Sequence, residues 1–184
     1  MRLTEVAQTW LAETLEEGDI AIDATLGNGF DALFLTEQVG ETGYVYGFDV
    51  QQDAITSSLE RLKDTACTYQ CFLAGHETMK EHIPTHHHGK IKAIMFNLGW
   101  LPNSNKSVMT KAETTLIALK QSLELLAPSG RLTVMVYPGH QGGDDEAKQV
   151  SQWLLQQQCM LVQTIKVAGK PHAPQLLQYI KCDI

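Results

Sequence analysis

A glycine-rich turn and an acidic residue near the start of the chain have the spacing of a nucleotide site. The segment DATLGNGFD, residues 23–31, follows an apolar run, and Asp49 ends the next apolar run, 20 residues after Gly29. Gly27 and Gly29 permit positive φ angles and let a ligand approach the backbone closely. An acidic residue at this distance commonly accepts hydrogen bonds from ribose hydroxyls. The glycine pair alone fits a tight strand-to-helix turn equally well, so the indication of a nucleotide depends on Asp49.

The nucleotide is not expected to be NAD. Thr25 stands where many nucleotide-binding loops have another glycine, and the position three after Gly29 is Ala32, so the GxGxxG signature is incomplete. No Tyr–Lys pattern typical of hydride transfer follows. The chain is also predicted to end in a β-hairpin, which is a feature of Rossmann-type methyltransferases rather than of dinucleotide dehydrogenases.

The segment FNLGWLP, residues 96–102, indicates chemistry on an amine. It places Asn97 at the carboxyl end of a predicted central strand, where ligands bind in open α/β sheets. Asn-x-x-aromatic resembles the (Asp/Asn)-Pro-Pro-(Tyr/Phe/Trp) signature of amino-group methyltransferases. The Asn97 side-chain oxygen and a backbone carbonyl can hold the N–H groups of an amine so that its lone pair faces a methyl-sulfonium. Trp100 offers a face for a planar base. The alternatives are that Asn97 caps a loop and that Trp100 lies in the core.

The elements that position these residues follow from alternating apolar runs and amphipathic stretches. Seven strands are predicted, at 20–27, 44–50, 67–74, 91–98, 131–138, 159–169 and 175–182. Helices are predicted at 1–15, 29–40, 51–62, 110–126 and 145–157. Pro128 and Gly130 are expected to end the fourth of these helices. The short link between the last two strands favours an antiparallel pair. We therefore expect a Rossmann-type α/β fold, with a mostly parallel seven-stranded sheet and helices on both faces.

Composition and charge restrict the class of protein. A chain of 184 residues, 43% hydrophobic and 19% charged, fits one globular domain spanning 1–184. The net charge of −7 argues against a nonspecific nucleic-acid coat but allows a local basic patch. The four cysteines are not spaced as CxxC, and the N-terminus lacks the pattern of a secretory signal, so we expect the cytoplasm. No apolar stretch is long enough to span a bilayer.

Four blocks together resemble a known family. They are IDATLGNGFDALFL at 22–35, VYGFDVQ at 45–51, IMFNLGWLPNSNKSVMT at 94–110 and VYPGHQGGDDE at 136–146. The chain is similar to a small family of bacterial S-adenosylmethionine methyltransferases called rRNA methylases. That family includes the enzyme that methylates the amine of 5-aminomethyl-2-thiouridine at the tRNA wobble position. Residues 103–106 read NSNK where relatives tend to have Gly-Gly-Asp-Lys, so only Lys106 keeps its place, and 168–175 match loosely.

The resemblance implies a class I methyltransferase fold, S-adenosylmethionine as cofactor and tRNA as partner. Its implied contacts to the methionine moiety come from Asp23, Gly27, Asn28 and Asp31, and those to the ribose from Asp49 and Gln51. We add Thr25, Gly29, His76 and Asn97 to this predicted cofactor set. The predicted acceptor site consists of Asn97, Gly99, Trp100, Leu101, Pro102, Lys106, Tyr137, Pro138, Gly139 and His140. Asn97, Trp100 and His140 are the predicted catalytic residues, with His140 as a general base, a loop-orienting residue or a phosphate contact.

Several residues keep two interpretations. His76 fits either an adenine contact or a solvated loop. His82 and the run 86–88 could bind a metal adventitiously, but no closed ligand set accompanies them, so no functional metal is expected. Five lysines are expected around the mouths of the third and fourth strands, where an RNA backbone needs cations, or else on a solvated face. They are Lys80, Lys90, Lys92, Lys106 and Lys111.

The predicted reaction is in-line displacement, in which an unprotonated amine attacks the sulfonium methyl and S-adenosylhomocysteine leaves. Three alternatives stay open: methylation of rRNA, methylation of a small-molecule amine, and a nucleotide-binding module without catalysis. The sequence does not decide whether the chain forms a homodimer.

Overall fold

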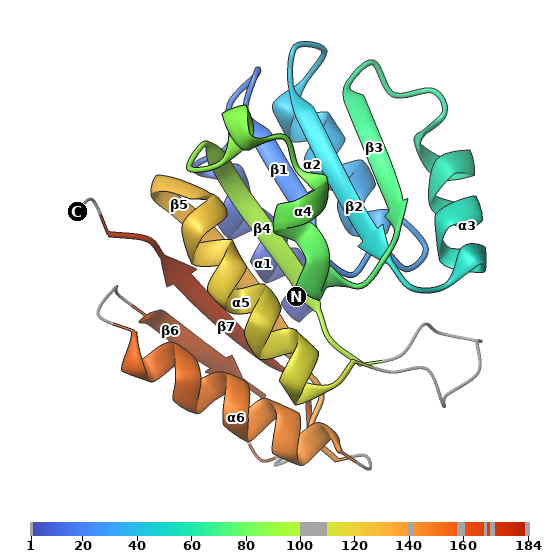
Figure 1. Ribbon diagram of the computed structural model, residues 1–184. Coiled ribbons are helices and arrows are strands. Elements are labelled where there is room, and N and C mark those ends of the chain that lie inside the picture. Colours follow the sequence, from blue (N-terminus) through green and yellow to red (C-terminus); the bar gives the residue numbers. More distant parts are fainter. Residues whose placement is uncertain are drawn as a thin grey trace.

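A twisted seven-stranded sheet forms the middle layer of the molecule (Figure 1). The computed structural model describes residues 2–99, 110–139, 142–157, 161–167, 169 and 172–182. The strands are β1 Ile20–Asp23, β2 Tyr44–Asp49, β3 Thr68–Leu73, β4 Ile91–Asn97, β5 Leu126–Val136, β6 Leu161–Lys166 and β7 Gln175–Ile180. Their order in the sheet is β3-β2-β1-β4-β5-β7-β6, with β7 antiparallel to both of its neighbours. The predicted mostly parallel sheet with a terminal antiparallel hairpin is confirmed.

Helices cover both faces of the sheet. They are α1 Leu3–Ala12, α2 Phe30–Val39, α3 Gln52–Leu62, α4 Met79–His82, α5 Ala112–Leu125 and α6 Gly143–Gln156, with short 3-10 turns η1 His76–Thr78 and η2 Thr85–His87. In Figure 1, α4, α5 and α6 lie in front of the sheet, while α1 and α2 lie behind it. Among the described residues, no helix has the length and apolar character needed to cross a membrane.

The core divides into layers because successive strand residues point to opposite faces. In β4, Ile94 and Phe96 join the core under α5 and α6, whereas Ala93 and Met95 join the core under α1 and α2. All four side chains are buried, which matches the near-continuous apolar sequence of a central parallel strand. This burial on both faces fixes the position of β4. Its last residue, Asn97, therefore lies at the carboxyl end of a central strand.

The start of β5 differs most from the expectation. The helix ends at Leu125, but β5 begins at Leu126 instead of 131 and therefore contains both Pro128 and Gly130. The pairing of β5 with β4 shifts in register in this stretch. Lys181 exchanges backbone hydrogen bonds with Ser129 and Gly130, at 3.0 and 2.9 Å. Proline and glycine are tolerated in such bulges, so a long-range contact extends the strand past residues that locally indicate a turn.

Gly29 is required by helix packing, and this gives a stability prediction. It caps α2 with φ +75°, and a Cβ at this position would lie 2.7 Å from Ser58 Oγ and 2.9 Å from Ser58 Cα. Gly89 has a similar φ of +73°, but a Cβ there would meet nothing within 4 Å. Gly89→Ala should therefore lower the free energy of unfolding only by the cost of a left-handed backbone, about 1–2 kcal/mol. Gly29→Ala should lower it further, as measured by urea unfolding. Equal losses for the two variants would show that α3 moves aside without cost.

Candidate active site

A cleft of about 800 Å³ opens where the parallel strands β1, β2 and β4 end. Ligands of open α/β sheets bind at this edge. Ten of the predicted site residues line the cleft: Thr25, Gly27, Asn28, Asp31, Asp49, Gln51, His76, Asn97, Gly99 and Tyr137. Residues more than 100 positions apart in the sequence are thus brought to one cavity by the strand order.

The carboxylate of Asp49 is held in a fixed orientation. Its Oδ2 accepts a hydrogen bond from the Gly27 N–H at 2.9 Å, and its Oδ1 accepts one from the Gln51 N–H at 2.9 Å. Each carboxylate oxygen has further acceptor capacity. A carboxylate fixed in this way can accept hydrogen bonds from two neighbouring hydroxyl groups of a ligand.

Asp23 lies beneath the cleft and not on its surface. Its side chain is 1% exposed, its Oδ1 accepts the Thr25 N–H at 3.1 Å, and its Oδ2 has no hydrogen-bond partner within the described residues. Burial, followed by the neighbouring charges of Asp31 and Asp49, holds the pKa of the Asp23 carboxyl well above its usual range, although the Thr25 N–H opposes this. Its predicted contact to a methionine moiety stays a prediction.

Asn97 is held by Tyr137 and lies beside Asp31. The Tyr137 hydroxyl donates to Asn97 Oδ1 at 2.8 Å, and the Asn97 side chain is near enough to Asp31 to lower the pKa of that carboxyl. Asp31 Oδ1 also accepts from the Gln8 amide of α1 at 2.9 Å. The Asn97 backbone N–H donates to Thr25 Oγ1 at 2.7 Å. The Asn97 oxygen is therefore already engaged, and one lone pair is left for a ligand.

This network perturbs two of its members. Burial raises the pKa of the Asp31 carboxyl, and the hydrogen bond from Gln8 and the nearby Asn97 side chain lower it part of the way. Burial, with a smaller contribution from the Asp31 charge, raises the pKa of the Tyr137 hydroxyl. Tyr137 therefore stays a hydrogen-bond donor at neutral pH, which fixes the direction of the hydrogen bond to Asn97.

His76 is a buried wall of the cleft, so its interpretation as a solvated loop histidine is wrong. Its side chain is 7% exposed, its Nδ1 lies 3.3 Å from the Ala24 carbonyl oxygen, and its ring meets Phe96 edge-on with centroids 5.5 Å apart. Burial lowers the pKa of the His76 imidazole, while the charge of Glu77 opposes this. The ring is neutral at pH 7 and its Nδ1 donates to Ala24.

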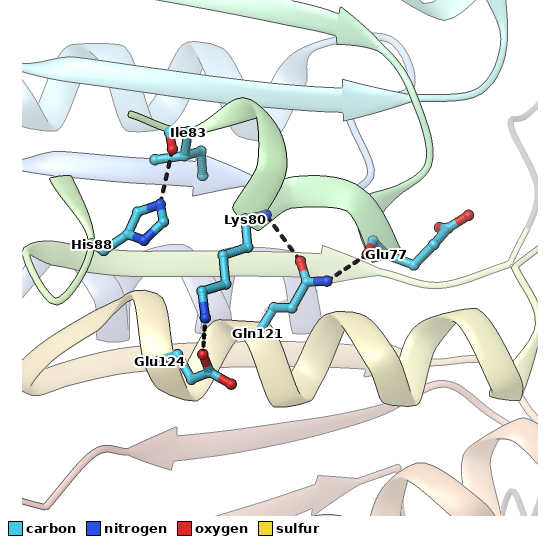
Figure 2. Close-up of polar contacts among 6 residues, drawn as sticks. All are labelled: Glu77, Lys80, Ile83, His88, Gln121 and Glu124. Carbon is cyan, nitrogen blue, oxygen red and sulfur yellow. Dashed lines mark hydrogen bonds and ion pairs between the residues drawn. The ribbon is translucent and has the colours of Figure 1, made fainter. Parts of the chain in front are cut away.

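The segment that carries His76 is fastened to α5 (Figure 2). Gln121 donates to the Glu77 carbonyl at 2.6 Å and accepts the Lys80 backbone N–H at 2.9 Å. The Lys80 ammonium pairs with Glu124, and His88 Nε2 bonds to the Ile83 carbonyl at 2.9 Å. Gln121 of α5 therefore holds the backbone immediately after His76 in place.

The predicted basic patch is only partly present at the cleft. Lys111 lines the cleft. Lys90 and Lys92 lie at the amino end of β4, roughly 20 Å from Asn97 at about 3.3 Å per residue. The expectation that these two lysines lie beside the site is wrong, because the cleft opens at the carboxyl ends of the parallel strands and not at their amino ends. Lys80 is engaged with Glu124, and Lys106 lies outside the described residues.

The histidine-rich segment makes separate local contacts. His87 Nδ1 lies 2.7 Å from the Tyr46 hydroxyl, and His82 Nδ1 lies 3.0 Å from the Thr78 carbonyl oxygen. No group of three or more His, Cys, Asp or Glu side chains in the described part of the chain is arranged to hold a metal ion.

Comparisons with known proteins agree on one family. The family described as "Putative rRNA methylase" matches residues 45–181. The "tRNA (mnm(5)s(2)U34)-methyltransferase, chloroplastic" of Arabidopsis thaliana is 39% identical over 160 residues, which cover 81% of this chain. The chain belongs to the rRNA methylase family. It spans 57% of the length of this curated relative.

Two solved structures of similar proteins match this chain over nearly its whole length. A "putative rRNA-methylase" from Clostridium thermocellum is 34% identical, with a TM-score of 0.89, 97% of this chain covered and 96% of the other. A "putative methyltransferase" from Streptococcus mutans, in complex with SAH, is 36% identical, with a TM-score of 0.83 and 98% of each chain covered. The family and the methyltransferase fold that the sequence motifs predict are confirmed.

Several predicted site residues do not line the described cleft. Gly29 packs against Ser58, and Gly139 donates its N–H to Asp144 Oδ1 at 3.1 Å. Pro138 is likewise not among the lining residues. The predicted residues Trp100, Leu101, Pro102, Lys106 and His140 lie outside the described residues. Their roles stay predictions.

Sequence reasoning missed three residues of the candidate site. Gln8 reaches Asp31 from the N-terminal helix, and Thr110 and Glu146 form a hydrogen-bonded pair beside Gly99. Thr110 and Glu146 end the third and fourth family blocks, which is a signal that could have indicated them. A single glutamine in an amphipathic helix gives no such signal.

The buried Asp23 carboxyl predicts a pH dependence of stability. Its folded pKa lies above the unfolded value of about 3.9, so the folded state binds more protons and stability falls as the pH rises above about 4. Each tenfold difference in proton affinity corresponds to about 1.4 kcal/mol. Asp23→Asn should therefore flatten the fall in the free energy of unfolding between pH 4 and 7, measured with urea. Asp64→Asn, at an exposed position, is the control and should run parallel to wild type. Parallel curves for Asp23→Asn would refute a protonated Asp23.

Proposed function

We propose that this chain transfers a methyl group from S-adenosylmethionine to the amine of 5-aminomethyl-2-thiouridine at the tRNA wobble position. The observation that carries the proposal is the pairing of two fixed groups in one cleft, the Asp49 carboxylate and the Asn97 amide. The SAH-bound Streptococcus mutans relative supports the cofactor, and the name of the Arabidopsis relative supports the acceptor. Residues 1–184 act in this proposal as one methyltransferase domain, in the cytoplasm.

The described residues fit this cofactor. The Asp49 carboxylate, with Gln51 beside it, is oriented to accept hydrogen bonds from two ribose hydroxyls. The His76 ring, which packs against Phe96, is the proposed contact for the adenine. Thr25, Gly27, Asn28 and Asp31 line the same cleft, and the proposal assigns them to the methionine moiety. The carboxyl of Asp31, with that of Asp23 beneath the cleft, complements the positive charges of a sulfonium and an ammonium group. When bound, the cofactor supplies an electrophilic methyl group.

The protein orients the acceptor amine. The free lone pair of Asn97 Oδ1 accepts one amine N–H, and a backbone carbonyl beyond the end of β4 accepts another, so that the nitrogen lone pair faces the methyl group. The hydrogen bond from the Tyr137 hydroxyl to Oδ1 keeps the Asn97 amide from rotating. Trp100 stacks on the pyrimidine, and His140 takes the proton or contacts a phosphate, as the sequence predicts.

Two features at the cleft favour RNA over a free metabolite as the acceptor. Lys111 lines the cleft and carries a charge suited to a phosphate. Phe30 also lines it with 60% of its side chain exposed, and the Arg61 guanidinium lies 3.6 Å from the ring centroid. Exposed aromatic and guanidinium planes suit unpaired bases of an RNA loop.

Asp49 should determine cofactor affinity. Asp49→Ala removes the acceptor for both ribose hydroxyls, so the binding free energy of S-adenosylmethionine should weaken by about 1.5–3 kcal/mol, as for hydrogen bonds to a charged group. Titration calorimetry measures this. Asp53→Ala removes an exposed carboxylate from the start of α3, the helix that follows Asp49, and should bind S-adenosylmethionine as wild type does. An Asp49→Ala affinity equal to wild type would remove the ribose assignment.

Asn97 should determine the rate of methyl transfer, and the assay that measures this rate also tests the proposed function. Incubation of undermodified tRNA with the cofactor, followed by mass spectrometry of its nucleosides, should show one added methyl on the wobble aminomethyl group. Asn97→Ala should lower the single-turnover rate by ~10²-fold or more, with a smaller effect on cofactor affinity.

The isolated aminomethyl nucleoside is the control acceptor. If it is methylated as efficiently as tRNA, the acceptor is a small-molecule amine and the RNA proposal fails. If methyl appears only on added rRNA, the tRNA proposal fails. Cofactor binding without transfer to any of these acceptors would favour a non-catalytic module.

A further inference from the structure

Glu146 is a buried carboxylate that forms one of its hydrogen bonds with a residue lining the cleft. It lies in the first turn of α6 with 5% of its side chain exposed. Its Oε2 accepts from the Thr110 hydroxyl at 2.8 Å, and its Oε1 accepts from the Thr115 hydroxyl at 2.8 Å. A carboxylate is costly to bury unless its oxygens are hydrogen-bonded, and the start of a helix further favours a negative charge. Glu146 therefore holds both threonine hydroxyls as donors.

Thr110 passes this constraint on to the end of β4. A hydroxyl has a single hydrogen, and because it is directed at Glu146, its lone pairs face other donors. The Gly99 N–H donates to Thr110 Oγ1 at 2.9 Å, and the Thr110 N–H donates to the Gly99 carbonyl at 2.9 Å. Gly99 has φ +128°, a conformation that other residues rarely adopt. Gly99 and Thr110 both line the cleft, and Gly99 follows Asn97 by two positions.

The same turn of α6 also holds the neighbouring connection. Asp144 Oδ1 accepts the Gly139 N–H at 3.1 Å. Gly139 lies two residues after Tyr137, whose hydroxyl fixes Asn97. Both described segments around Asn97, the end of β4 and the end of β5, are therefore tied to the first turn of α6.

We propose that Glu146 is a positioning residue for the acceptor side of the site, acting through Thr110 on Gly99. The proposal rests on the proposed methyl transfer at Asn97. The hydrogen bonds of Asp49 come from Gly27 and Gln51 and do not involve α6. Loss of the Glu146–Thr110–Gly99 relay should therefore impair use of the acceptor and leave cofactor affinity unchanged.

Four variants separate a positioning role from a merely structural one. Thr110→Val removes the hydroxyl but keeps the shape, and Thr110→Ser keeps the hydroxyl. Glu146→Gln leaves one acceptor oxygen for two hydroxyls. Thr115→Val is the matched control, because it removes a hydrogen bond to Glu146 of the same 2.8 Å length from a buried residue that does not line the cleft.

Kinetics with undermodified tRNA and the protection of the Gly99 amide are the two readouts. Thr110→Val and Glu146→Gln should lower kcat/KM for tRNA by about 10- to 100-fold, with SAH affinity within about twofold of wild type. Thr110→Ser should restore most of the rate. Hydrogen exchange at Gly99 should speed up in Thr110→Val and stay at the wild-type rate in Thr115→Val, although Thr115→Val lowers the unfolding midpoint.

Two results would overturn the proposal. One is wild-type kinetics and Gly99 exchange in Thr110→Val. The other is an equal kinetic loss in Thr115→Val, which would make Glu146 a general stabiliser. If Glu146→Gln does not fold, the Thr110 pair and the Thr115 control still decide. Wild-type protein that methylates no acceptor would instead overturn the proposed function, and Gly99 exchange would then decide on the relay alone.

Discussion

The pair of hydrogen bonds that fixes Asn97 is the constraint on which the rest of the site depends. Its partners come from different parts of the fold: Thr25, in the turn after β1, accepts the Asn97 backbone N–H, and Tyr137, at the end of β5, donates to the side-chain oxygen. Asp31, which accepts a hydrogen bond from Gln8 of α1, lies beside the amide. Since an amide can rotate by 180° and exchange donor for acceptor, an amine would meet the wrong group without the Tyr137 hydroxyl. The turn after β1 and the strand beside β4 are therefore both needed to present one oxygen lone pair to the cleft.

The carboxyls around the cleft are not equivalent. Asp49 has a backbone N–H on each oxygen, whereas the pKa values of the Asp23 and Asp31 carboxyls are raised, in both cases mainly by burial. A cationic ligand would favour the charged forms of both and so lower these pKa values. Binding of a cation and loss of protons are therefore linked at this site. That linkage agrees with the charges of the proposed cofactor, and a neutral nucleotide would leave the carboxyls uncompensated.

Sequence patterns predicted the elements well and the contacts between them less well. The strands of the parallel sheet follow from local apolar runs, because both of their faces are buried. The early start of β5 depends on Lys181, more than 50 residues away. Pro128 and Gly130 therefore predicted a turn where the structure has a strand. Lys90 and Lys92 were placed at the wrong end of β4, because closeness in sequence to a motif does not distinguish the two ends of a strand. Gln8 was missed since nothing near it in the sequence indicates Asp31, 23 residues later.

The extent of the family match bears on which residues the site needs. The match begins at residue 45 and includes Asp49, Asn97, Tyr137 and Glu146, but not Gln8, the glycine turn or Asp31. The matched part alone would leave the Asn97 backbone N–H without its acceptor, Thr25 Oγ1, and Asp49 without the Gly27 N–H. A buried donor without a partner costs about 1–3 kcal/mol, and Asn97 would lose one of the two hydrogen bonds that place it. Residues 2–44 therefore complete the site physically: β1 supplies the central strand beside β4, and the turn that follows it supplies the groups that orient both Asp49 and Asn97.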